Sequence, residues 1–177
     1  MSSLFARSVH DLTAAAWFGG SLMGAVGLNG AAAEAKDPRE RTRLSSLGWK
    51  KWAPVQSASI FAHIAAGLPL IWDNKGRLAN QQGVAASAAV KTLVTLAGAG
   101  VTLYAGILGG KVEKLSEQGA EGATEPSPHA SDELKAAQKQ LKILQWTIPV
   151  FSGAVVVLGA QQGEQQRPTQ VKKGLFQ

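Results

Sequence analysis

Four ionisable side chains lie in or beside apolar stretches of the sequence: His10, Asp11, His63 and Lys91. Ionisable groups at membrane depth are costly and normally face a protein interior or water. Such side chains can take up and release protons, and two histidines with one carboxylate can hold a divalent metal ion. We therefore take these four residues as the candidate polar site, with His10 and His63 as the ligands if a metal binds.

Composition excludes much other chemistry. The chain has no cysteine and only two methionines, which excludes thiol catalysis and zinc–thiolate sites and disfavours a methionine-rich soft-metal site. The sequence contains no Ser-His-acid set, phosphate loop, nucleotide fingerprint or metalloprotease pattern. We therefore predict no catalytic residues and disfavour an enzyme.

Four apolar blocks must position these residues. They cover 9–33, 52–72, 84–110 and 143–160, and each is near the ~20 residues that a helix needs to cross ~30 Å of hydrocarbon. None has the sustained polar stripe of a soluble amphipathic helix. The blocks predict a single-domain, all-α integral membrane protein with four transmembrane helices. An unusually apolar soluble four-helix bundle is the alternative.

The beginnings of the blocks are similar in pairs. VHDL at Val9 is similar to VKTL at Val90, and WAP at Trp52 is similar to WTIP at Trp146. This pattern is consistent with two repeated helical hairpins related by an axis along the membrane normal.

The connections differ in charge, although the chain as a whole carries a net charge of +6. Lysine and arginine are concentrated in the loops 34–51 and 111–142, so the positive-inside rule places these loops in the cytoplasm and both termini outside. The distribution therefore indicates a bacterial inner membrane and its lipids, and no nucleic acid. We expect 116–131 to be a flexible cytoplasmic loop and 161–177 to be a polar tail. Ser131 or Asp132 would cap a cytoplasmic helix that continues into the fourth block.

Small residues recur at helical spacing in two blocks, and such rows allow close helix packing in lipid. The predicted packing residues are Gly20, Gly24, Gly98, Thr102, Gly106 and Gly110. They would form contacts within the chain or the seam of a homo-oligomer. Tryptophans near the block ends are expected to anchor the helices at the membrane interface; they are Trp49, Trp52, Trp72 and Trp146.

The depths of the four ionisable residues follow from their places in the blocks. His10 and Asp11 would lie at the outer end of the first helix, and Lys91 about two turns inside the outer end of the third. His63 would lie near mid-membrane, roughly 10 Å from His10 along the normal, which disfavours a haem held by both histidines. Asp11 would pair with Lys91 or lie at the helix N-terminus, and Lys91 could instead extend outward to water.

The stretch VHDLTAAAWFGGSLMGAV resembles the first helix of small bacterial four-helix membrane proteins related to the copper-resistance CopD-like domain. The shared pattern consists of His10, Trp17, Gly19 and Gly20. A basic first loop and a histidine in the second helix are also similar. The resemblance covers mainly the first two helices and implies a membrane bundle, with metal handling as the associated activity.

These observations leave two functional hypotheses of different classes. The favoured one is a non-enzymatic accessory or scaffold subunit of a membrane complex, which packs through its glycine rows against itself or a larger partner. The alternative is a small metal-ion or proton carrier or sensor that uses His10, Asp11, His63 and Lys91, and a haem-binding membrane protein ranks third. No cofactor is expected under the favoured hypothesis.

Overall fold

The computed structural model describes residues 3–175, and its regular elements are helices in these residues. A first run comprises α1 (Ser3–Met23), a π-helical segment η1 (Gly24–Leu28) and α2 (Asn29–Ala33). It is followed by α3 (Pro38–Asp73), α4 (Lys75–Asn80), α5 (Val84–Lys114), a 3-10 segment η2 (Ser116–Gln118), α6 (Asp132–Glu164) and α7 (Pro168–Leu175). The all-α prediction is therefore confirmed for the described residues.

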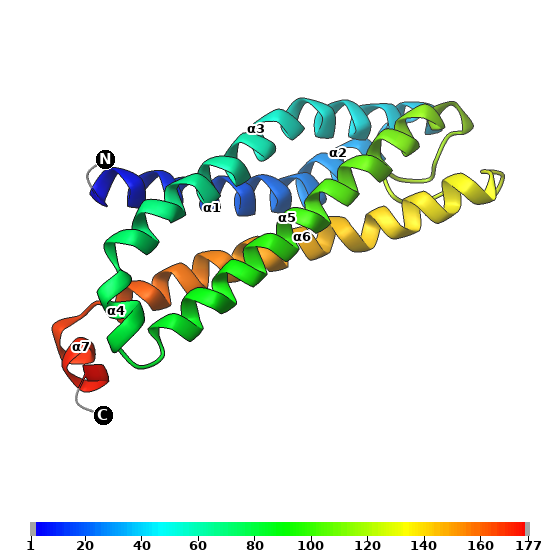
Figure 1. Ribbon diagram of the computed structural model, residues 1–177. Coiled ribbons are helices and arrows are strands. Elements are labelled where there is room, and N and C mark those ends of the chain that lie inside the picture. The colour runs from blue at the N-terminus through cyan, green and yellow to red at the C-terminus, as the bar shows by residue number, and fades with distance from the viewer. Residues whose placement is uncertain (1–2, 176–177) are drawn as a thin grey trace.

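The long helices form an elongated bundle in which α1 begins and α7 ends at the same end (Figure 1). The most extensive packing is within two sequential pairs, α1 with α3 and α5 with α6. The helix α1 also packs on α6, whereas α3 and α5 contact each other much less. This arrangement has the pairing expected of two hairpins.

Three helices are long and apolar enough to cross a membrane, namely α3, α5 and α6. The first predicted block, 9–33, is not among them. The helix α1 contains Arg7 and Asp11 and ends at Met23, where the π-helical segment begins. Large apolar side chains such as Phe61, Leu103 and Val150 point outward from the other three helices. Such a surface is suited to lipid.

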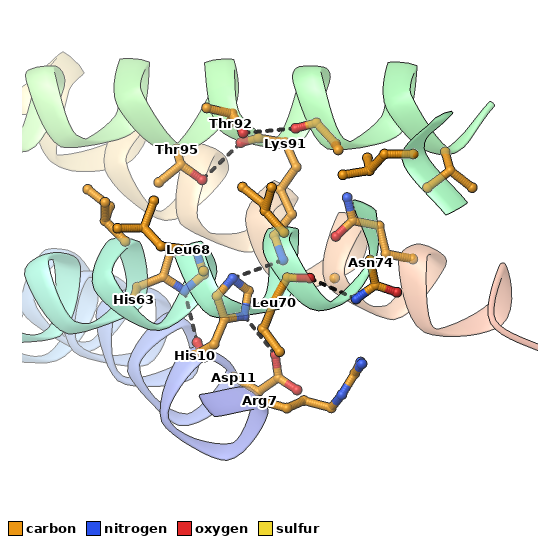
Figure 2. Close-up of a pocket in the computed structure, with 18 of the residues that line it drawn as sticks. Arg7, His10, Asp11, His63, Leu68, Leu70, Asn74, Lys91, Thr92 and Thr95 are labelled. Carbon is orange, nitrogen blue, oxygen red and sulfur yellow. Dashed lines mark hydrogen bonds and ion pairs between the residues drawn. The ribbon is translucent and has the colours of Figure 1, made fainter. Parts of the chain in front are cut away.

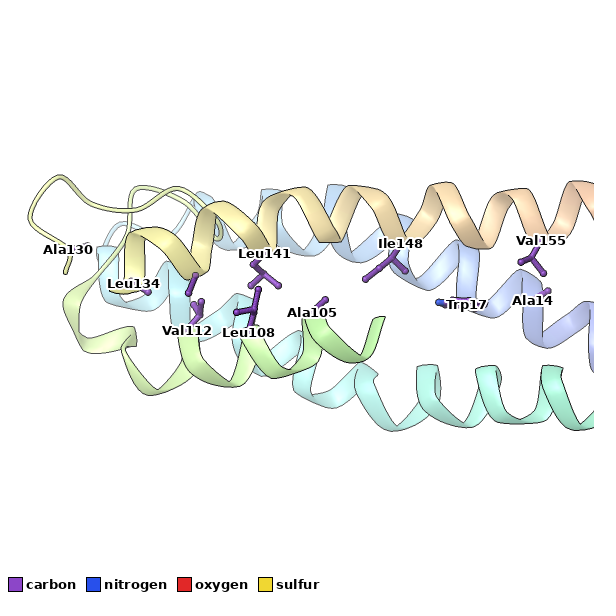
Figure 3. Close-up of a cluster of buried hydrophobic side chains, with 11 residues drawn as sticks. Ala14, Trp17, Ala105, Leu108, Val112, Ala130, Leu134, Leu141, Ile148 and Val155 are labelled. Carbon is purple, nitrogen blue, oxygen red and sulfur yellow. The ribbon is translucent and has the colours of Figure 1, made fainter. Parts of the chain in front are cut away.

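The core of the bundle combines one large aromatic side chain with small and branched residues (Figure 3). Trp17 is fully buried between α5 and α6, and its indole Nε1 donates to Thr102 Oγ1 at 3.3 Å. An added Cβ at Gly98 would lie 2.9 Å from both Trp17 and Phe151, so a side chain there would collide with the core. Gly98 and Thr102 therefore form helix contacts within the chain.

The other predicted packing residues divide into two groups. Gly20 and Gly24 lie under the indole rings of Trp52 and Trp49, and a Cβ at either glycine would overlap those rings. These two tryptophans therefore pack into the bundle instead of serving as simple surface anchors, whereas Trp72 and Trp146 are exposed. Among the described residues, no atom lies within 4 Å of a Cβ built at Gly106 or Gly110.

The helices on the predicted cytoplasmic side are longer than the apolar blocks. The helix α3 begins at Pro38, where Asp37 accepts from the Arg39 backbone N–H, and α6 begins at Asp132. Ser131 accepts from the Leu134 backbone N–H at 3.3 Å, which confirms the predicted cap. As a consequence, Pro54 and Pro149 lie in the interior of long helices.

The segment 116–131 follows a defined path between the helices. Ala120 donates its backbone N–H to Pro38 O at 3.1 Å, and Ala120 also bridges to Pro126. Glu125 pairs with Lys142 on α6 at 2.9 Å. The flexibility of this segment stays a prediction. The tail contains α7, which is tied to the α4–α5 turn by a hydrogen bond from Gln82 N to Gly174 O.

Candidate functional site

The structure brings all four predicted polar residues together at the end of the bundle where α1 begins (Figure 2). His10 Nδ1 lies 3.0 Å from Asp11 Oδ1, and Lys91 Nζ from α5 lies 3.4 Å from His10 Nε2. His63 from α3 places its Nδ1 2.8 Å from the backbone oxygen of His10. The two imidazole rings stack with their centroids 3.9 Å apart.

These contacts define where the protons lie. Because a carboxylate accepts and an ammonium donates, neutral His10 carries its proton on Nδ1 and presents Nε2 to Lys91. His63 must donate from Nδ1, since a carbonyl oxygen only accepts. The side chain of His10 is 10% exposed, but that of Asp11 is 63% exposed. A hydrogen-bonded chain therefore leads from water at Asp11 through His10 to buried Lys91.

Two glycines make room for this cluster. A Cβ at Gly67 would lie 3.6 Å from His10 Cδ2, and Gly67 follows His63 by one helical turn on the same face of α3. A Cβ at Gly159 on α6 would lie 3.2 Å from Lys91 Nζ. Bulkier residues at these positions would push α3 and α6 away from the charged groups.

The predicted depth difference between the two histidines is wrong. The helix α1 begins at Ser3, before the apolar block, so His10 lies about two turns inside it. The helix α3 runs antiparallel to α1 and continues to Asp73, so His63 lies at the same level as His10. The apolar limits of the blocks did not coincide with the ends of the helices.

A cavity of about 200 Å³ adjoins the cluster. Three basic side chains line it, Arg7, Arg77 and Lys91, against the single carboxylate of Asp11. Arg77 donates to Asn74 Oδ1 at 3.0 Å and to Gln165 O at 2.8 Å. Burial and the nearby Arg7 guanidinium lower the pKa of Arg77 from its ordinary value. The cavity is therefore positively charged and rich in donors, which suits a small anion.

Sequence reasoning missed two groups of residues. Arg7 and Arg77 were not among the predicted site residues, although Arg7 lies one helical turn before His10 in the sequence. Asn29 was also missed. Its Oδ1 accepts from Ser45 and Trp49, and its Nδ2 donates to Gln145 Oε1 at 2.7 Å. The occurrence of a single asparagine in the first apolar block was the available signal for this second group of polar contacts.

In the described residues, no three His, Cys, Asp or Glu side chains are grouped to hold a metal ion. An iron between two imidazoles needs a ring nitrogen from each directed at it. Here the rings of His10 and His63 lie against each other with their planes tilted by 30°, and the Nδ1 of each is already hydrogen-bonded. This arrangement is better suited to proton transfer than to shared ligation.

Comparison with known proteins gave no match to a family model, a curated protein or a solved structure. The resemblance of the first helix to CopD-like proteins therefore stays a prediction.

Proposed function

We propose that the chain is a multi-pass protein of a bacterial inner membrane in which the run from α1 to α2 makes a fourth crossing beside α3, α5 and α6. Three helices that are long and apolar enough to span, with exposed apolar side chains, support this. The basic segment 34–51 at the end remote from His10 supports an orientation with the polar cavity outside.

The activity that we propose is binding of a small anion coupled to proton uptake, in a sensor or carrier. The observation that carries it is the hydrogen-bonded chain Asp11–His10–Lys91 beside a positively charged cavity. The exposed carboxylate of Asp11 gives protons an entry from water. His10 lies between that entry and buried Lys91, so its protonation alters the charge that a bound anion meets.

Proton and anion binding favour each other in this arrangement. A proton on His10 adds a positive charge to a cavity that already holds three basic side chains. An anion in the cavity offsets their repulsion, so it raises the affinity of His10 for its proton. By linkage, proton uptake must raise the affinity for the anion by the same factor.

The accessory or scaffold role is the competing proposal. Helix association in lipid needs small residues and complementary shape, which this chain has, but it does not need a buried lysine next to two histidines. The polar cluster therefore favours a binding function over packing alone. A scaffold that assembles as a homo-oligomer or within a larger complex becomes the conclusion if the binding test fails.

The test is calorimetric titration of the protein in lipid nanodiscs with acetate, inorganic phosphate and chloride. Titrations at about pH 6 and about pH 8 lie on either side of the ordinary histidine pKa of ~6.5. Buffers of different ionisation enthalpy report the protons taken up with each anion. We expect tighter binding at the lower pH, with net proton uptake.

Three variants distinguish an anion-binding site from a polar cluster that only packs the helices together. His10→Gln should remove the pH dependence, and Lys91→Met should weaken anion binding at both pH values. His129→Gln is the matched control, because His129 is exposed on the segment 116–131, remote from the cavity. If none of the anions binds, or if His10→Gln leaves the pH dependence intact, the proposed function is wrong.

A further inference from the structure

A second and larger cavity, of about 640 Å³, lies between α3 and α5 with α6 as its back wall. Ile64 lines both this cavity and the one beside the cluster around His10, and the other lining residues of the two cavities differ. Cavities of 300–1,000 Å³ that are mostly apolar, with a few polar groups, are typical of small-molecule sites.

The lining changes in polarity along the bundle axis. Polar side chains gather toward the basic end: Ser45, Lys50 and Glu113, with Gln56 and Gln145 beyond them. Lys50 Nζ pairs with Glu113 Oε1 at 2.9 Å and links α3 to α5 at that end. Toward the middle of the bundle the lining is apolar and consists mainly of Ile60, Phe61, Ile64, Leu103 and Ile107. A ligand that fits must therefore be polar at one end and long and apolar at the other.

Two amide side chains that line this cavity, Gln56 and Gln145, have an unpaired NH₂ group. Gln56 is only 5% exposed, yet its Nε2 has no hydrogen-bond partner among the described residues. Gln145 is also buried, and its Oε1 is occupied by Asn29 Nδ2, which leaves its own NH₂ group for the cavity. An unpaired buried donor is costly, so an acceptor from a ligand would be favourable at this position.

The cavity is kept open by glycines. Gly106, Gly109 and Gly110 line it on α5, and no described atom lies within 4 Å of a Cβ built at any of them. A partner helix is 10–12 Å across with its side chains. The cavity is too small for a partner helix, but it suits an aliphatic chain.

We propose that this cavity binds one anionic phospholipid, with an ester carbonyl accepting from the amides of Gln56 and Gln145 and an acyl chain lying along Ile60 and Leu103. Gln56 lies five residues beyond Lys51, where the basic segment 34–51 ends, and Gln145 lies three residues beyond Lys142. Both amides therefore lie about one turn beyond the last basic residues before the apolar stretches of α3 and α6, near the edge of the hydrocarbon where ester carbonyls lie in a bilayer. The basic segment 34–51 follows at the same end and attracts the negative headgroup. The inference does not depend on the anion site around His10.

The test is native mass spectrometry of the full chain, extracted in mild detergent after reconstitution with phosphatidylglycerol or phosphatidylcholine. We expect one retained lipid per chain and a preference for phosphatidylglycerol. Gly106→Leu should project a side chain into the cavity and strongly reduce retention. Gly100→Leu is the matched control, because Gly100 is exposed on α5 outside the cavity, and it should retain the lipid.

A second variant keeps the proposal testable if Gly106→Leu does not fold. Gln56→Leu preserves the side-chain volume but removes the donor, and loss of one hydrogen bond in lipid should weaken retention about threefold. Equal retention by wild type, Gly106→Leu and Gln56→Leu would overturn the proposal. It would also be overturned if wild type retained no lipid, or if a co-purified quinone or a partner helix occupied the cavity instead.

Discussion

Alanine substitutions at the adjacent glycines Gly19 and Gly20 are expected to change the stability of the bundle in opposite directions. Both glycines lie near the end of α1, inside the helical run that continues through η1 and α2, but they face different surroundings. No described atom lies within 4 Å of a Cβ built at Gly19, which is exposed. A Cβ built at Gly20 would overlap the indole ring of Trp52.

The magnitudes follow from this difference. Gly19→Ala gains helix propensity, up to about 1 kcal/mol, with no steric cost. Gly20→Ala has the same gain but forces α1 and α3 apart or moves Trp52, and overpacking of this kind costs about 1–3 kcal/mol. Moving Trp52 would give up the packing of its rigid ring against Gly20. We therefore expect the two variants to differ by about 2 kcal/mol in the free energy of unfolding, or roughly 30-fold in the unfolding equilibrium constant.

Reversible unfolding in mixed micelles of increasing SDS content, followed by tryptophan fluorescence and circular dichroism, measures this difference. In a Trp52→Ala background, Gly20→Ala should no longer destabilise the bundle, because the ring that the new methyl group meets is gone. The packing of α1 on α3 described above would be refuted if both alanine variants were equally stable. It would also be refuted if Gly20→Ala cost as much stability without the Trp52 ring as with it.

Three further predictions use other contacts of the bundle. Trp17→Phe and Thr102→Val should be coupled in a double-mutant cycle by about 0.6 kcal/mol, and additive unfolding free energies would contradict their hydrogen bond. Asn29→Leu should destabilise the bundle by about 1–3 kcal/mol in the same assay, because Ser45, Trp49 and Gln145 each lose a hydrogen-bond partner. Unchanged stability would contradict a stabilising role of these hydrogen bonds. Partial burial acts to raise the pKa of Glu125, but hydrogen bonds from Lys142 and Thr124 outweigh it and hold this pKa below 4.5. The ionised Glu125 carboxylate therefore stabilises the folded state fully above its ordinary pKa. This stabilisation is lost as the pH falls through the lower pKa of the folded state. Thermal unfolding of Glu125→Gln should be less sensitive to pH in that acidic range than that of wild type, and parallel pH profiles would contradict this.

The apolar blocks and their caps gave reliable information about the helices. Continuous apolar runs predict long helices because the period of the pattern and the absence of polar stripes are properties of the chain alone. Ser131 could be identified as a cap because a serine before a helix accepts from the first turn regardless of tertiary structure. The polar segments that extend α3 back to Pro38 carry no such hydrophobic signal, and this is why the helix limits were missed.

The polar site could be predicted as a set of residues but not as an arrangement. His10, Asp11, His63 and Lys91 are conspicuous because charged groups are rare in apolar runs. Their relative depth depends on where each helix begins and how the helices are offset, and an error of two turns moved His63 by roughly 10 Å. The contributions of Arg7 and Arg77 depend on contacts between distant segments, such as that of Arg77 with Gln165, which the local pattern does not encode.

The π-helical segment Gly24–Leu28 determines how the side chains after it are rotated relative to those before it. Its Asn29 backbone N–H bonds to Gly24 O, five residues back, so this turn holds one residue more than an α-helical turn. Each residue turns an α-helix by about 100°, so deleting Val26 would rotate Asn29 by that angle relative to His10. The extra residue thus sets the rotational phase between the site around His10 and the polar contacts of Asn29. A chain of the same composition but one residue shorter at this point could satisfy either end of the bundle, but not both.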